Sequence, residues 1–521
     1  MALCPLQNSN NYNCDNYNYN KKPAEAIGLG SLMEKREYFS SRWALLLAAL
    51  GMAIGTGNIW RFPRIAAQNG GAAFLIPWII FLFLWSIPLL ITELTIGKSM
   101  RLGPVGAFGK LIGKKFTWMG GFVGFCTMAI MFYYSVVMGW CVKYFIASIS
   151  GKLTNVSGIE YWTQFSSTQF QPILYHFLAI SIGAFIIYRG VVKGIERANK
   201  ILIPSLFILI LIGAIRALRL PGAIDGLNFF FNPQWELLLD YKVWLNALTQ
   251  SAWSTGAGWG LLLTYGVYLK KREDIVLNSF ITGLGNNSAS LLIGIMIFPA
   301  VFALAPQLGL IPEEIMAEVG PANTGLAFIW IPNLFTKVPG SSIFTAIFFL
   351  ALSFAALSSL IAMIEMVTRI LMDMGVKRDR AIVMVWISAF ILGIPSALSL
   401  EFFGNQDWAW GVGLMVSGFF FASAVIVYGA KNFRERLINQ IGNDINVGKW
   451  YEIIIKYIIP LEFIVLIVWW FWQSVNWDPE TWWNPFGTYS LGTCIFQWAM
   501  VILLFIIFNK KINNKIFNIK T

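Results

Sequence analysis

Charged residues are scarce in this chain. They make up only 12% of its 521 residues, whereas 57% of the residues are hydrophobic and the mean hydropathy is +0.64. Soluble domains carry about 25% charged residues, so the composition excludes an ordinary soluble protein and indicates one that crosses a membrane several times. The formal net charge of +12 does not indicate a nucleic-acid partner, because the basic residues lie in short connections between apolar segments.

Cysteine and histidine are also rare. The 5 cysteines are scattered along the chain, without the spacing of a disulfide framework or of a metal site. The single histidine, His176, begins an apolar segment and is interpreted as a polar anchor rather than a ligand. The apolar segments lack a nucleophile paired with a base and lack a phosphate-binding loop, so we expect no enzymatic activity.

Long apolar runs are what the chain has in abundance. Twelve runs, the first at residues 43–66 and the last at 488–508, are long enough for membrane-spanning helices. Most of the 38 lysines and arginines fall in the tails and in the even-numbered connections. This positive-inside bias predicts a multi-pass protein of the cell (plasma) membrane with both termini in the cytoplasm.

The runs divide the chain into four parts. Residues 1–34 are rich in asparagine and tyrosine, cannot form a core, and are expected to be a disordered cytoplasmic tail. We expect a first five-helix repeat over residues 35–217 and a second, inverted repeat with outside loops over residues 218–430. Helices eleven and twelve and a cytoplasmic C-terminal tail follow over residues 431–521.

The first run contains an anomaly. Residues 43–60 carry no charge, yet Gly51, Gly55 and Gly57 crowd the centre of this stretch, where a helix should break. A broken helix in a bilayer leaves N–H and C=O groups that need protein, a ligand or an ion as partners. The segment from Gly51 to Asn58 is therefore interpreted as a binding site at mid-membrane depth. The alternative is close helix packing through small residues.

The sixth run, at residues 243–269, repeats this anomaly with Gly256, Gly258 and Gly260. The first and sixth runs begin two halves of five spans each. Because five is odd, the second half is inverted and both breaks can meet at the midplane. We therefore predict an all-α polytopic membrane protein with twelve transmembrane helices, a 5+5 inverted repeat with unwound first and sixth helices plus two additional helices.

The stretch GMAIGTGNIWRFPRIAAQNGGAAFLIPW resembles the first signature of the neurotransmitter:sodium symporter family, and the likeness to its bacterial leucine-transporter-like amino-acid symporters runs from about Arg36 to Asp407 or beyond. Its run G-x-G-N-x-W-R-F-P, followed by N-G-G-x-A-F, is highly specific. The resemblance implies sodium-coupled symport of a neutral, hydrophobic amino acid into the cell by alternating access. A non-transporting amino-acid sensor of the same fold is the alternative, although the chain has no long soluble domain to signal through.

The resemblance also implies two sodium ions, each needing about six oxygen ligands. The first is expected to bind the substrate carboxylate together with Ala53, Asn58, Ser254 and Asn286. Sharing that carboxylate would couple the ion to the substrate. The second is expected to bind the carbonyls of Gly51, Ile54 and Ala355 and the hydroxyls of Ser358 and Ser359. For the two serines, the alternative is back-bonding to carbonyls four residues earlier.

The same resemblance implies a substrate pocket between the breaks. The carboxylate would meet amides near Gly55 and Gly57 and the hydroxyl of Tyr134. Monoamine carriers of the family have an aspartate at the position of Gly55, so the glycine favours an amino acid. The implied substrate-binding residues are Ala53, Gly55, Gly57, Ile130, Tyr134, Val137, Trp253, Ser254, Gly256, Trp259, Ser358 and Met363. This set carries no formal charge, which favours a neutral side chain.

Charged residues would form gates on either side of the pocket. Arg61 is expected to pair with Asp407 outside, because each charge alone at that depth would cost about 2.5–3.5 kcal/mol. Inside, Arg36 is expected to pair with Asp373, and Tyr268 is expected to brace Arg36. The alternative for Arg36 is a residue that belongs only to the positive-inside bias.

Ser290 raises the question of chloride. Many bacterial members of the family have a glutamate at this position, whereas chloride-dependent animal members have a serine that helps to bind the anion. The residues that could donate to chloride here are Gln250, Ser254, Asn286 and Ser290. The usual tyrosine after Pro77 is Trp78, so binding and its absence remain alternatives. Membrane lipid is the other expected partner, and monomer and dimer are both left open.

Overall fold

Helices are the only regular elements in the part of the chain that the computed structural model describes, which comprises residues 37–153, 156–320, 323–336, 340–440 and 444–517. The predicted all-α fold class is thus confirmed. The tail predicted over residues 1–34 and the expected gate residue Arg36 lie outside the described residues.

Nine helical stretches in the described ranges are long and apolar enough to cross a membrane. They coincide with the second to fifth and the seventh to eleventh apolar runs, and they are Ala72–Met100, Lys114–Ile149, Phe170–Tyr188, Val191–Leu218, Val276–Leu308, Ser341–Asp373, Arg378–Leu398, Leu400–Tyr428 and Trp450–Trp477. The twelfth run is α23 (Leu491–Ile507), bent by 57° against α24 (Asn509–Phe517). The first and sixth runs are the two interrupted spans.

Most uninterrupted spans are one long helix, and some carry a short π-helical turn. Their elements are α4 (Ala72–Phe81), η1 (Leu82–Ser86), α5 (Ile87–Met100), α7 (Thr117–Ile149), α9 (Phe170–Tyr188), η3 (Val191–Glu196), α10 (Arg197–Leu218), α14 (Val276–Leu304), α17 (Ser341–Asp373), α18 (Arg378–Leu398), α19 (Leu400–Tyr428), α21 (Trp450–Ile453), η9 (Ile454–Ile458) and α22 (Ile459–Trp477). The connections contain α6 (Pro104–Ile112), η2 (Lys114–Phe116), α8 (Gly158–Ser166), α11 (Ala223–Phe231), η4 (Trp235–Leu239), η5 (Pro306–Leu308), α15 (Pro312–Ala317), η7 (Leu326–Trp330), α16 (Ile331–Phe335), α20 (Ala430–Phe433) and η8 (Arg434–Ile438).

The first span is interrupted, as predicted. After α1 (Arg42–Ala53), the backbone of Ile54 (φ −78°, ψ 93°) and Gly55 (φ −107°, ψ −172°) is extended. The helix resumes in α2 (Thr56–Ile59) and continues in α3 (Arg61–Gln68). Two extended residues in mid-span are enough to release the hydrogen bonds of one helical turn.

The break is shorter than the segment from Gly51 to Asn58 that was interpreted as a binding site. Asn58 already belongs to α2, and Gly51 is still within α1. The reason is packing. A Cβ atom on Gly51 would lie 2.1 Å from the side-chain oxygen of Asn199 in α10. At this one position, close packing through a small residue is what the glycine provides.

The sixth span unwinds through its glycines. It consists of α12 (Tyr241–Ser254) and α13 (Leu261–Val267), which are separated by non-helical backbone. Within that break, φ is +71° at Gly256, +89° at Gly258 and +78° at Gly260. A residue with a Cβ atom is strained in this region, so the alternating glycines let the chain leave the helix without strain.

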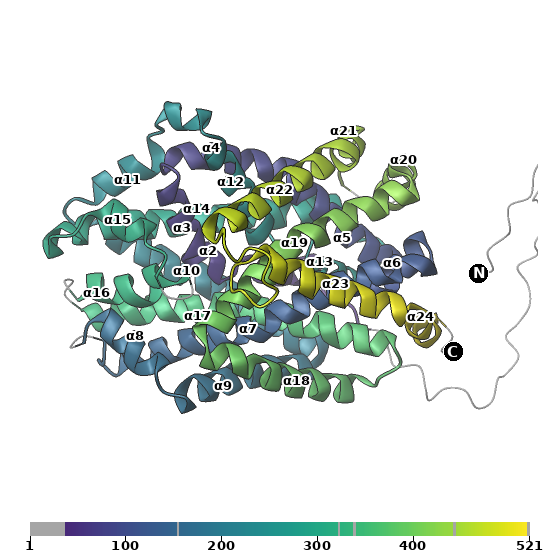
Figure 1. Ribbon diagram of the computed structural model, residues 1–521, viewed down its shortest axis with the longest axis horizontal. Coiled ribbons are helices and arrows are strands. Elements are labelled where there is room, and N and C mark those ends of the chain that lie inside the picture. The colour runs from purple at the N-terminus through teal and green to yellow at the C-terminus, as the bar shows by residue number, and fades with distance from the viewer. Residues whose placement is uncertain (1–36, 154–155, 321–322, 337–339, 441–443, 518–521) are drawn as a thin grey trace, which may run out of the picture. The chain divides into compact units, whose positions relative to one another are not determined.

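The two breaks lie against each other. α1 packs against α10, α14 and α17, and it also contacts α13, while α2 contacts α12. Around them, α7, α9, α17 and α18 pack side by side (Figure 1). Glu37–Thr521 forms one compact unit. The boundaries predicted at residues 217 and 430 would therefore divide internal repeats rather than separate bodies, and they stay predictions.

Glu93 holds the unwound part of the sixth span. Its carboxylate is fully buried in α5 and accepts hydrogen bonds from the amide of Gly258 at 2.6 Å and from that of Leu263 at 3.2 Å. The hydroxyl of Ser417 donates to the carbonyl of Gly258. These side chains replace helical partners that the break removes, as a membrane interior requires.

We expect the Glu93→Ala variant to lose about 2–4 kcal/mol of unfolding free energy, because two buried amides lose their acceptor. Glu93→Gln keeps one acceptor oxygen and should lose less. Chemical unfolding of the detergent-solubilised protein measures the loss. Glu435→Ala is the control, since Glu435 pairs with Arg434 but is 46% exposed and should lose less than about 1 kcal/mol. Equal losses for Glu93→Ala and Glu435→Ala would contradict this role.

Candidate functional site

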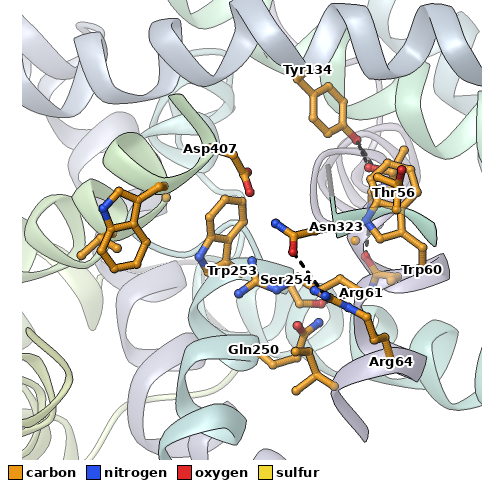
Figure 2. A pocket seen from close by; sticks show the side chains of 18 of the residues that line it. Thr56, Trp60, Arg61, Arg64, Tyr134, Gln250, Trp253, Ser254, Asn323 and Asp407 are labelled. Atoms are coloured by element: carbon orange, nitrogen blue, oxygen red, sulfur yellow. Dashed lines mark hydrogen bonds between the residues drawn. The ribbon is translucent and has the colours of Figure 1, made fainter. Parts of the chain in front are cut away.

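The break in the first span turns two amides toward side chains. The amide of Gly55 donates to Oδ1 of Asn58 at 3.0 Å, and the amide of Thr56 donates to the hydroxyl of Tyr134 at 3.2 Å. The hydroxyl of Thr56 lies 3.3 Å from the same tyrosine oxygen. Figure 2 shows the hydroxyl of Tyr134 in contact with Thr56 at the edge of the pocket. Neutral donors thus converge at the start of α2.

The carbonyls freed by the break face α17, and together with Ser358 and Ser359 they form what is here called the second oxygen group. In a continuous helix, the carbonyls of Gly51 and Met52 would accept from amides four residues later, but here both accept from the hydroxyl of Ser359 at 3.3 Å. Ser358, which is fully buried, donates to the carbonyl of Ala355 at 3.0 Å. Ser358 therefore makes a local back-bond, three residues earlier rather than four, whereas Ser359 bonds across to the first span.

A separate set of oxygens, here called the first oxygen group, lies where the two breaks meet. Nδ2 of Asn58 is 2.8–3.2 Å from the side-chain oxygens of Ser254, Asn286 and Ser290. The same end of the Asn286 amide lies 3.2 Å from the carbonyl of Ala53 and 3.1 Å from that of Ser254. With its nitrogen at this end, the amide donates to both carbonyls. With its oxygen there, three oxygens meet without a proton between them, an arrangement that a cation would stabilise.

A cavity of about 580 Å³ lies between the two breaks. All the predicted substrate-binding residues line it except Ile130 and Ser358, which are fully buried. Its wall at the sixth span is aromatic, because the rings of Trp253 and Trp259 meet edge to face with centroids 6.0 Å apart. From the breaks, the lining extends past Asp407 to the connections at Val319 and Tyr489.

The ion pair expected between Arg61 and Asp407 is not formed. Both residues line the cavity, but no ion pair joins them in the described part of the chain. Instead, the guanidinium carbon of Arg61 lies 4.4 Å from the ring centroid of Trp253, and Figure 2 shows Asp407 apart from Arg61. The open cavity keeps the two walls apart, and the indole face stabilises the cation in place of the carboxylate.

Sequence reasoning missed Arg64. Only 7% of this residue is exposed, it lines the same cavity, and Nη1 donates to Oδ1 of Asn323 at 3.3 Å. Its position three residues after Arg61 places both arginines on one helix face. The spacing was visible in the sequence, but the contact with a distant connection was not.

On the other side of the breaks, toward α6 and α24, charged groups are paired (Figure 1). The hydroxyl of Tyr268 donates to Glu365 at 2.5 Å, and Arg378 donates to the two oxygens of Glu365 at 2.7 and 2.9 Å. Asp373 accepts from Arg369 at 2.5 Å. None of these residues is among those that line the cavity.

These contacts differ from the expected inner gate. Tyr268 was expected to brace Arg36, but its described partner is Glu365. Asp373 accepts from Arg369, four residues earlier on the same helix, and from the amide of Gly103 at 2.6 Å. Because Arg36 lies outside the described residues, its pairing with Asp373 stays a prediction.

Two buried polar groups, the amide of Gln250 and the indole N–H of Trp78, lack partners among the described residues. Gln250 is 1% exposed, and neither its Nε2 nor its Oε1 has a hydrogen-bond partner among the described residues. The same holds for the indole N–H of Trp78, which is fully buried. Of the other residues expected to hold chloride, Ser290 lies 2.8 Å from Asn58. Buried donors without an acceptor are costly.

Comparison with known proteins shows which sequences and structures this chain is similar to. A sequence model of the Sodium:neurotransmitter symporter family matches residues 36–171 and 167–514. An uncharacterised sodium-dependent transporter of Methanocaldococcus jannaschii is 32% identical over 83% of this chain and 89% of its own length. An uncharacterised sodium-dependent transporter of Bacillus subtilis is 30% identical over 84% of this chain and 98% of its own. The crystal structure of MhsT in complex with L-phenylalanine is similar with a TM-score of 0.72 and 31% identity, covering 83% of this chain and 99% of that one.

The cavity predicts where thiol reagents reach the site. The described native cysteines, Cys126, Cys141 and Cys494, are buried, so a background with serine at the two remaining cysteines should be unreactive. In that background, we expect Ile65→Cys, in the cavity wall, to react with a hydrophilic methanethiosulfonate reagent. Leu263→Cys, fully buried in α13, should stay unmodified.

Intact-mass measurement in detergent reads the modification of both variants. Faster modification of Leu263→Cys than of Ile65→Cys would show that water enters from the opposite side.

Proposed function

The chain belongs to the sodium:neurotransmitter symporter family, and on this premise we propose that it carries a neutral, hydrophobic amino acid into the cell together with sodium by alternating access. One observation carries the proposal. The two helix breaks meet at one cavity, with donors on one side and oxygens without formal charge on the other. Such a site suits a cation, which the oxygens would bind, together with a carboxylate, which the donors would bind.

The first sodium ion would bind where the two breaks meet. Its ligands would be the carbonyl of Ala53 and the side chains of Asn58, Ser254 and Asn286, and the convergence of these oxygens at about 3 Å supports this. The substrate carboxylate would complete the shell. Because the ion and the substrate would then share a bond, each would raise the affinity of the site for the other by the same factor.

The second sodium ion would bind between α1 and α17. The freed carbonyl of Gly51 and the hydroxyls of Ser358 and Ser359 support this site, together with the carbonyls of Ile54 and Ala355. Two sodium ions moving with a zwitterion would supply about 7 kcal/mol at a tenfold gradient and 100 mV. That is enough to concentrate an amino acid strongly.

The substrate class rests on Gly55. A Cβ atom there would lie 3.1 Å from both the hydroxyl of Tyr134 and the hydroxyl of Ser359. An acidic side chain at this position would occupy the space beside Tyr134 that we assign to the substrate carboxylate. A neutral and hydrophobic side chain of the substrate would face Val137, Trp259 and Met363. The L-phenylalanine bound by MhsT supports a substrate of this class.

We further propose that the site takes chloride. Gln250 and Trp78 bring buried N–H donors without acceptors among the described residues, and Ser290 adds a hydroxyl beside Asn58. No ionised acid belongs to the first oxygen group. A chloride ion near these donors would balance the charge of the sodium ions.

The transport cycle would alternate access to this site from two sides. With Arg61 and Asp407 apart, the described conformation corresponds to access from the side of Val319 and Tyr489, which we assign to the outside of the plasma membrane, with both termini cytoplasmic. Pairing of Arg61 with Asp407 would close this side. Opening of the other side would then release the substrate and sodium into the cell.

A thermal-shift screen of the twenty amino acids, in sodium against potassium, tests the proposed function. We expect stabilisation by a few neutral amino acids and only in sodium, reaching about 2.7 kcal/mol at a hundredfold excess over Kd. Gly55→Asp should abolish it, because its carboxylate repels that of the substrate. Ser353→Ala is a matched control, since Ser353 only back-bonds to Phe349 in α17.

Counterflow of the stabilising amino acid in proteoliposomes then separates a transporter from a sensor. Counterflow that requires sodium supports symport. Stabilisation without any counterflow would identify a sensor. Equal stabilisation in sodium and in potassium would contradict the two proposed sodium sites.

Replacement of chloride by gluconate tests the anion. We expect sodium-driven uptake to fall in gluconate, and we expect Ser290→Glu to transport equally in both salts, because its carboxylate supplies the negative charge. Uptake is measured at a fixed sodium gradient. Unchanged uptake by the unmodified protein in gluconate would refute the chloride proposal and leave the sodium sites untouched.

A further inference from the structure

Asn199 carries an oxygen that the fold leaves without a partner. This residue lies in the first turn of α10 and is fully buried. Its Nδ2 donates to the carbonyl of Ile195 at 2.9 Å, which fixes the amide orientation, because a flipped amide would bring two oxygens together. Oδ1 has no hydrogen-bond partner among the described residues. A buried unpartnered amide oxygen in a membrane helix is destabilising unless something binds it.

This oxygen lies against Gly51, whose carbonyl belongs to the second oxygen group. A Cβ atom on Gly51 would fall 2.1 Å from Oδ1 of Asn199 and 3.1 Å from Cβ of Ser358. The glycine therefore brings the backbone of α1, the amide oxygen of α10 and the serine of α17 into direct contact. Any other residue at position 51 would separate them.

The neighbouring hydroxyls do not satisfy this oxygen. Ser358 donates to the carbonyl of Ala355, and Ser359 donates to the carbonyls of Gly51 and Met52. Each hydroxyl proton is thus directed to a carbonyl, and none is directed to Asn199. The lone pairs of these groups remain, and what they attract is a cation.

We propose that Oδ1 of Asn199 is a further oxygen ligand of the second sodium ion, on the side of that ion that faces α10. This inference rests on the proposed function, which assigns five oxygens to the ion. A hard cation of this size takes about six oxygen ligands, and Asn199 supplies the sixth. The ion is then held between three helices, α1, α10 and α17, rather than two.

This assignment changes what the sodium ion does. If only α1 and α17 bind the ion, its affinity depends only on the distance between those two helices. With Asn199 as a ligand, the ion also fixes α10 against the break in the first span. Movement of α1 away from α10 would remove one ligand and weaken the site, so release of sodium is coupled to the position of α10.

The test is the sodium concentration that gives half of the maximal thermal stabilisation of the detergent-solubilised chain, measured without substrate and at constant ionic strength with potassium. We expect Asn199→Ala to raise this concentration about tenfold or more. Asn199→Asp keeps the shape and adds a negative charge, so it should lower the concentration below that of the unmodified protein. A purely structural role would lower the unfolding temperature equally in sodium and potassium and leave the half-saturating concentration unchanged.

Asn278→Ala is the matched control. Asn278 is also a buried asparagine whose Nδ2 donates to the carbonyl four residues earlier and whose Oδ1 is unpartnered among the described residues, but it lies beside Glu273 near the start of α14. We expect its half-saturating sodium concentration to be unchanged. A sodium shift in Asn278→Ala as large as that in Asn199→Ala would overturn the proposal.

Ser359→Ala separates this inference from the function on which it rests. If Ser359→Ala raises the half-saturating concentration and Asn199→Ala does not, then the second site exists and Asn199 is not its ligand. If neither variant shifts while Asn286→Ala does, then the second site itself is refuted. A shift in both Ser359→Ala and Asn199→Ala, with the expected gain in Asn199→Asp, supports the proposal.

Discussion

The structure depends on one constraint, which is that a backbone polar group inside a membrane must have a partner. Two helices break in mid-span, and side chains from other helices meet several of the freed groups. Glu93 takes the amides of the sixth span, and Ser359 takes the carbonyls of the first. Where the two breaks meet, the partners are other oxygens and amides rather than charges. The cavity, the oxygen groups and the proposed substrate site all follow from these two interruptions.

The absence of formal charge from the oxygen groups has a mechanistic consequence. If a fixed carboxylate neutralised a sodium ion at the first group, the ion would bind with or without substrate. Asn58, Ser254 and Asn286 offer only dipoles, so in the proposed mechanism the missing negative charge comes from the substrate itself. The binding of sodium and that of substrate are then coupled because the protein alone does not neutralise either of them. The coupling is strong when each binds weakly without the other and tightly with it.

Much of this fold could be read from the sequence, because its signals are local. Apolar runs predict the spans. The glycines at positions 256, 258 and 260 predict a break, because glycine adopts the positive φ that the backbone has there. Gly51 shows the limit of this reasoning. It carries the same signal as Gly55, yet it remains helical because Asn199 packs against it from a helix almost 150 residues away.

The charged residues show the same limit more clearly. Arg61 and Asp407 were expected to pair because of their depth in the membrane, but the guanidinium of Arg61 lies over the ring of Trp253 instead. Glu365 and Arg378 were not foreseen at all, since nothing in the sequence states that α17 and α18 approach each other at those residues. Pairing between distant residues depends on tertiary geometry, which local periodicity does not contain.

The placement of the buried ion pairs indicates which parts can move. Arg378 and Glu365 join α17 to α18, and the pair of Arg369 with Asp373 lies within α17. Both pairs therefore stay inside one group of packed helices. Separating a buried pair would cost about 3–5 kcal/mol.

The contacts that tie α1 to its surroundings on the same side are weaker. The amide of Phe39 donates to the carbonyl of Tyr268, and Arg42 makes ion pairs with Glu273 and Asp444 while its side chain is 38% exposed. Exposed pairs of this kind contribute about 0–1 kcal/mol each. Ser40, just before α1, also donates to Glu196, which is 3% exposed and keeps Lys200 as a partner. α1 can therefore move outward without separating a buried ion pair, as the proposed alternating access would need.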